Sequence, residues 1–118
     1  MKYCWFGFLL AIAAFRVQAF AVQGGCNLKF AHAITGQLGG AIDNAAQAHV
    51  VVRANMLEAD LSNAVKAGVL THQQARQKWD EVDNIRQQAL ASKQAIAPHQ
   101  LKWFDDKLDG ITKYLCHR

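Results

Sequence analysis

The sequence predicts an all-α protein: a small up-and-down helical bundle with three main helices and a short N-terminal helix, closed by one disulfide. Apolar residues recur at steps of three and four along most of the chain from Ala41 onward, which is the spacing of one face of an α-helix. No run alternates apolar and polar residues for long enough to indicate a strand. Helix-ending residues divide the periodic pattern into separate stretches, and Cys26 and Cys116 lie near the two ends of the helical region.

The longest periodic stretch covers residues 41–67. Gly68 follows it, at the position where a glycine with a left-handed backbone commonly ends a helix. We therefore predict one long helix over this range. Its apolar seam consists of Val50, Ala54, Leu57, Leu61 and Val65.

Two further helices have recognisable starts. Thr71 and Gln74 have the spacing of a capping box, in which each side chain bonds to a backbone N–H of the first turn. Pro98 is tolerated in the first turn of a helix and not deeper, so the chain breaks at residues 95–97 and a new helix begins. The seam of the earlier helix is Ala75, Trp79, Val82, Ile85 and Ala89, and that of the later one is Leu101, Phe104, Leu108, Ile111 and Leu115.

Oppositely charged residues stand four apart on these helices, where they can pair on the outer faces. The expected pairs are Arg76 with Asp80, Lys102 with Asp106, and Asp109 with Lys113.

Residues 22–40 form a glycine-rich N-terminal segment with five of the eight glycines, a density that disfavours one rigid helix from residue 27 to residue 67. Such a helix would also place Cys26 about 60 Å from its far end, at about 1.5 Å per residue. Cys116 is expected near that far end, and a disulfide requires Cα atoms within about 7 Å. We therefore predict a short helix over residues 27–38 and a chain reversal at Gly39–Gly40, which returns Cys26 toward Cys116.

The first 21 residues are typical of a secretory signal peptide. Lys2 precedes an apolar run over residues 5–15, which is shorter than the roughly 20 apolar residues that cross a bilayer. Arg16 ends the run. Val17-Gln18-Ala19 and Ala19-Phe20-Ala21 each have small or short residues at the two positions that a signal peptidase inspects, and we predict cleavage after Ala21. An uncleaved membrane anchor and a lipid anchor on Cys26 stay open as alternatives.

Export predicts a periplasmic or secreted protein in an oxidising compartment, with no stable membrane insertion after cleavage. The mature chain would keep 97 of the 118 residues, with residues 41–118 as the helical bundle, and Cys26 and Cys116 would pair as a disulfide. Its 11 Lys and Arg against 9 Asp and Glu are spaced singly, which argues against a nucleic-acid partner.

Residues 69–74 and 95–100 begin two similar units, 26 residues apart, each with a small turn, a cap and an amphipathic helix. The first opens with Gly68-Val69-Leu70-Thr71-His72-Gln73-Gln74. This stretch resembles the short helical-hairpin repeats of small bacterial periplasmic proteins, whose helices open with a Gly-x-Leu-Thr-x-x-Glu/Gln phrase. The second unit lacks the glycine and the threonine, and the resemblance covers under half of the chain. It implies a location and a helical shape, and no particular activity.

The residues that could carry chemistry form no catalytic or metal-binding pattern. No two of the five histidines stand three or four apart on one predicted helix, so we expect surface histidines at helix ends and no metal site. Ser62 and Ser92 lack the surroundings of a nucleophilic serine. We therefore predict no catalytic residues, no cofactor and no enzyme activity. The histidines are His32, His49, His72, His99 and His117.

One face of the last helix favours partner binding. Trp103, Lys107, Gly110 and Tyr114 lie in a line beside the apolar seam, which puts two large aromatic residues and a gap next to each other. Gly110 inside a helix costs about 1 kcal/mol relative to alanine, a cost that the close approach of another backbone would explain. The alternative is that both aromatic residues widen the core of this chain.

The leading prediction is an exported, non-enzymatic protein-binding protein of the bacterial envelope, of an accessory, immunity or inhibitor-like kind. Its partner would be another envelope protein or a second copy of the chain. The alternatives are a periplasmic metal or small-ligand sensor or carrier that uses the histidines, and a structural anchor that keeps its first segment.

Overall fold

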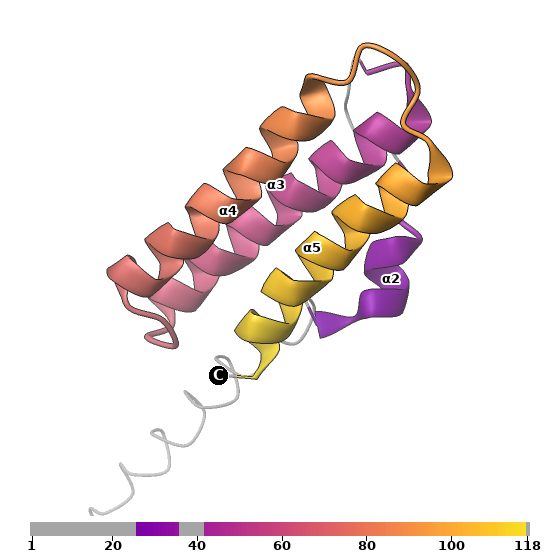
Figure 1. The fold of residues 1–118 in the computed structure, drawn as a ribbon. Coiled ribbons are helices and arrows are strands. Elements are labelled where there is room, and N and C mark those ends of the chain that lie inside the picture. The colour runs from indigo at the N-terminus through magenta and orange to yellow at the C-terminus, as the bar shows by residue number, and fades with distance from the viewer. Residues whose placement is uncertain (1–25, 36–41, 118) are drawn as a thin grey trace, which may run out of the picture.

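The computed structural model describes residues 26–35 and 42–117, and its regular structure is helical (Figure 1). The short helix α2 covers Leu28–His32, and three long helices follow: α3 over Ala45–Lys66, α4 over His72–Leu90 and α5 over Pro98–Cys116. The described ranges contain no strand. The predicted all-α class is confirmed. Within the same ranges, no helix is both long and apolar enough to cross a membrane.

Helix α3 begins four residues later than predicted, because Asn44 caps it. The Asn44 side chain accepts a hydrogen bond from the Gln47 backbone N–H at 2.8 Å, and residues 42–44 are not helical. Its C-terminal end matches the prediction. Gly68 adopts a φ of 77°, and the N–H groups of Gly68 and Val69 bond to the carbonyls of Val65 and Ala64 at 3.0 and 2.8 Å.

Helices α4 and α5 start as the sequence indicates. Thr71 and Gln74 form the expected capping box, with side-chain bonds of 3.1 and 2.9 Å to each other's backbone N–H. Pro98 is the first residue of α5, where its missing N–H costs no helical hydrogen bond. Both helices are 19 residues long. The two similar sequence units that begin at residues 69 and 95 therefore contain helices of equal length.

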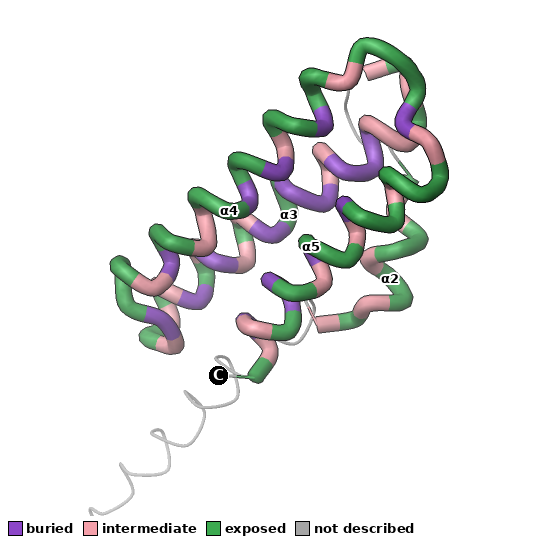
Figure 2. The backbone as a smooth tube through the Cα atoms, in the orientation of Figure 1, coloured by how far each residue is buried: buried purple, intermediate pink, exposed green. Residues whose placement is uncertain are grey.

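The three long helices run up and down side by side, with α3 behind α4 and α5 in Figure 1. Their facing sides enclose one apolar core, and Figure 2 shows the buried positions turned inward while the outer faces are exposed. Most predicted seam residues are buried there, and Val50, Ala54, Leu61, Ala75, Val82, Ala89 and Leu108 are fully so. Val65, Trp79 and Leu101 are half-buried at the edge of the core.

Helix α2 lies beside α5 and ties the N-terminal segment to the bundle (Figure 1). Cys26 and Cys116 form the predicted disulfide, with their Cα atoms 5.7 Å apart. The short helix is smaller than predicted: Asn27 caps it, but it ends at His32 and Ile34 is no longer helical. The proposed reversal at Gly39–Gly40 and the predicted signal peptide lie outside the described residues.

Candidate functional site

A groove of about 510 Å³ runs between α4 and α5. Its floor is formed by the apolar side chains of Ile85 and Ile111. Both belong to the core, and only 6% and 3% of their surface is exposed. Trp103 and Lys107 line the α5 side. The α4 side is acidic and polar, with Asp80, Glu81, Asn84 and Gln88.

Trp103 is the large aromatic residue of this groove, and 44% of its surface is exposed. Its ring meets Phe104 edge-on at 5.2 Å between centroids, and the Lys107 ammonium lies 5.4 Å from the indole centroid. These contacts orient the indole without covering it. An exposed tryptophan beside an apolar floor is the arrangement that commonly supplies the central contact of a protein interface.

The structure separates the four residues predicted for partner binding. Trp103 and Lys107 line the groove, whereas Tyr114 is half-buried against the core with the Lys78 ammonium 4.5 Å from its ring centroid. Gly110 lies on an exposed turn of α5, and a Cβ built on it meets nothing within 4 Å. Within residues 26–35 and 42–117, no close approach therefore accounts for Gly110, and its role in partner binding stays a prediction.

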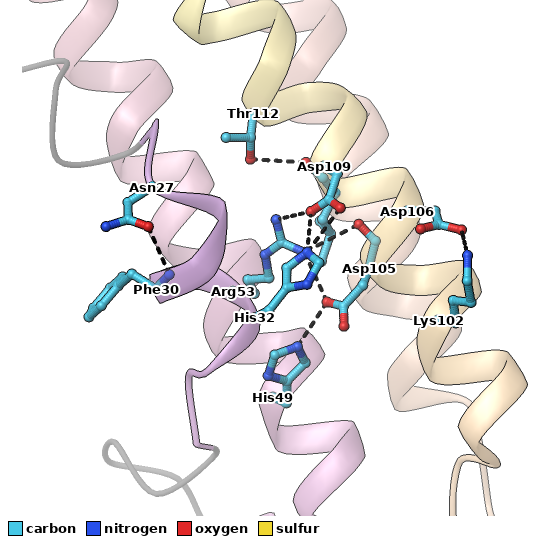
Figure 3. Close-up of polar contacts among 11 residues, drawn as sticks. Asn27, Phe30, His32, His49, Arg53, Lys102, Asp105, Asp106, Asp109 and Thr112 are labelled. Atoms are coloured by element: carbon cyan, nitrogen blue, oxygen red, sulfur yellow. Dashed lines mark hydrogen bonds and ion pairs between the residues drawn. The ribbon is translucent and has the colours of Figure 1, made fainter.

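A second polar site joins α2, α3 and α5 (Figure 3). We call it the Arg53 cluster, and it consists of Arg53, Asp105, Asp109, His32 and His49. Arg53 is 2% exposed and donates to Asp105 at 2.9 Å and to Asp109 at 2.6 Å. His49 contacts Asp105 at 2.8 Å, and His32 contacts Asp109 at 2.9 Å. Each aspartate thus holds Arg53 and one histidine.

Hydrogen bonds inside this cluster favour the ionised forms of His49 and Asp105. The hydrogen bond to Asp105 raises the pKa of His49 above its ordinary value and outweighs the opposing effect of burial. Burial pushes the pKa of Asp105 upward, but the hydrogen bonds from His49 and Arg53 prevail and lower it. The carboxylate of Asp105 is therefore charged at neutral pH.

The arrangement does not present His49 as a general base. Its Nε2 faces Asp105 and its Nδ1 lies 2.7 Å from the Ile34 carbonyl oxygen, so both ring nitrogens are engaged. A catalytic histidine needs a nitrogen that reaches the substrate. The geometry therefore indicates a charged link between elements.

The Arg53 cluster corrects two predictions. His49 is not a surface histidine, since it is 7% exposed in the second turn of α3. Asp109 does not pair with Lys113 on the outer face but points inward to Arg53 and His32. The predicted pair of Lys102 and Asp106 is confirmed at 2.8 Å.

The sequence carries a signal for this cluster. His49 and Arg53 stand four apart beside the seam of one helix, and Asp105 and Asp109 stand four apart beside the seam of another. Residues four apart lie on one face of a helix, so each pair presents its two side chains together when the helices pack.

Among residues 26–35 and 42–117, no three His, Cys, Asp or Glu side chains are grouped to hold a metal ion. Comparisons with protein-family models, with curated proteins and with solved structures found no match for this chain.

Proposed function

We propose that this chain is an exported, non-enzymatic protein of the bacterial envelope that binds another envelope protein through the groove between α4 and α5. The accessory, immunity and inhibitor-like roles all belong to this class. The observation that carries the proposal is Trp103, which is 44% exposed beside an apolar floor in the groove. The disulfide between Cys26 and Cys116 supports a periplasmic or secreted location, because such bonds persist in oxidising compartments.

The shape and charge of the groove favour an amphipathic helix as the bound element. Two helices form its walls, so a third helix can lay an apolar ridge on Ile85 and Ile111. Asp80 and Glu81 line the α4 side, and Glu81 already contacts Lys78 at 3.1 Å. Asp80 has no ion pair within the described part of the chain. We therefore expect a basic side chain on the partner where it faces α4.

Photo-crosslinking in cells tests this proposal. A photoreactive amino acid at Gln88, inside the groove, should trap a partner, and the same amino acid at the exposed Asn63 of α3 should not. Trp103→Ala should abolish the crosslink while the unfolding midpoint stays unchanged. Leu90→Ala is the matched control, because Leu90 has the same 44% exposure and does not line the groove.

Once the trapped partner has been purified, its affinity for each variant tests whether the groove is the binding site. Trp103→Ala should weaken binding at least about 30-fold, which corresponds to the roughly 2 kcal/mol of an interface hot spot. Asp80→Lys should slow association most at low salt. Equal affinities for Trp103→Ala and Leu90→Ala would exclude the groove as the binding site.

A further inference from the structure

We propose that His49 is a proton-dependent clasp: it holds residues 34–35, which follow α2, against α3 and α5 while both ring nitrogens are protonated, and releases them when one proton is lost. Both atoms that face the ring accept hydrogen bonds and donate none. Nδ1 lies 2.7 Å from the Ile34 carbonyl oxygen and Nε2 lies 2.8 Å from an Asp105 carboxylate oxygen. A neutral imidazole carries one N–H and satisfies one of them, whereas an imidazolium satisfies both.

Loss of a proton breaks the contact with Ile34 rather than the one with Asp105. The Asp105 carboxylate is charged and also accepts from Arg53 at 2.9 Å, so it retains the remaining N–H more strongly than a neutral carbonyl does. The Nδ1 lone pair then faces the Ile34 carbonyl oxygen at 2.7 Å, and the two acceptors repel each other. The buried His49 ring is held by α3, so the backbone of Ile34 moves away.

The release stays local because other contacts keep α2 in place. The disulfide anchors Cys26 to the end of α5, and His32 contacts Asp109 at 2.9 Å through a bond that needs only one imidazole N–H. Ile34 lines a cavity of about 590 Å³ together with Ile42 and Leu101. Movement of residues 34–35 therefore uncovers the apolar surface of this cavity.

Among the charges around His49, the Asp105 carboxylate favours the protonated ring and the Arg53 guanidinium opposes it. Arg53 lies on the same helix, Asp105 and Asp109 come from α5, and His32 of α2 belongs to the same cluster. Asp43, which precedes α3, lines the same cavity, and α4 contributes none of the described residues that line it.

The direction of the pH effect follows from the hydrogen bond that His49 makes with Asp105, which raises the pKa of His49 above 6.5. The clasp is complete below pH 6.5 and weakens as the pH rises through the raised pKa.

Nuclear magnetic resonance of the full-length, disulfide-closed protein tests the clasp between pH 5 and 9.5. The ring nitrogens of His49 should both be protonated at pH 6.5 and titrate with a midpoint above that value. The backbone amides of residues 34–35 should shift with the same midpoint. Binding of an apolar fluorescent dye should increase at least threefold over the same interval.

Variants separate the clasp from a general loss of structure. Asp105→Asn should lower the proton affinity of His49 at least threefold, and His72→Gln, at an exposed helix start, should leave it unchanged. The wild-type titration decides the case even if Asp105→Asn does not fold. A neutral His49 at pH 6.5, or amides of residues 34–35 that do not follow its titration, would overturn the proposal.

Discussion

Asp105 and Asp106 are neighbours on α5 with opposite surroundings, which makes them a matched pair for testing the Arg53 cluster. Figure 3 shows Asp105 pointing toward His49 and Arg53, whereas Asp106 points away toward Lys102. Replacing either with alanine changes the helix propensity of the same helix by the same amount. The difference between the two variants therefore reports the contacts alone.

We expect Asp105→Ala to lower the free energy of unfolding by about 3 kcal/mol, the lower end of the range for breaking a buried ion pair. The lower end applies because the Asp105 side chain retains 14% exposure. The cost arises on the partners. Arg53 is 2% exposed and keeps the Asp109 carboxylate and the backbone carbonyl of residue 105, and the buried His49 loses its carboxylate partner. Asp106→Ala removes one contact with an exposed lysine and should cause no measurable change.

Thermal and urea unfolding at pH 6.5, with the disulfide intact, measures both variants. A loss of about 3 kcal/mol lowers the midpoint temperature by roughly 12 to 24 °C in a domain of this size. Circular dichroism should show the same helical content for both folded variants. Equal losses for Asp105→Ala and Asp106→Ala would refute the inference that the cluster contributes to stability through buried charges.

Other changes probe the disulfide, the core and the half-buried carboxyl group of Asp60. Replacing both Cys26 and Cys116 with serine should cost about 4 to 5 kcal/mol by the chain-entropy model for a loop of this length, and hydrogen exchange should show α2 detached while α3, α4 and α5 persist. Leu108→Ala should lower the free energy of unfolding, measured in denaturant, by about 2 to 5 kcal/mol, because Leu108 is fully buried. Lys107→Ala, at the exposed preceding residue, should lower it far less. Burial raises the pKa of Asp60 above 3.8, so this carboxyl group destabilises the fold as the pH rises from 3.8 through the raised pKa. Asp60→Asn should therefore raise the unfolding midpoint at pH 7. A lowered midpoint would contradict this reasoning. Intact-mass analysis of the exported protein should find residues 1–21 removed and no free thiol, and a retained leader would favour the membrane-anchored alternative.

The helices follow from local signals, and for that reason they are predictable. Gly68 has the left-handed backbone that ends α3, and Thr71 and Gln74 cap α4. Pro98 begins α5. Each of these effects reaches only a few residues along the chain. The errors in helix boundaries have equally local causes. Asn44 caps α3 after the predicted start. Helix α2 ends at His32, short of the range 27–38 that we predicted from the reversal at Gly39–Gly40.

The partner-binding face was only partly predictable, because helical spacing gives a direction around one helix and not the position of its neighbour. Trp103 and Lys107 face α4 across the groove, and Tyr114 on the same predicted line packs against the core. Which residues of that line stay exposed and which are covered depends on side-chain packing between the helices.

The sequence by itself determined the class of fold, the end of α3, the starts of α4 and α5 and the disulfide, since these depend on hydrophobic period, on caps and on the need to bring two chain ends together. Only the tertiary structure decided that Arg53 and His49 are buried charges held by Asp105 and Asp109. These contacts join residues 52 to 56 positions apart in sequence. The attraction between them exists only after α3 and α5 have packed and removed water from their interface.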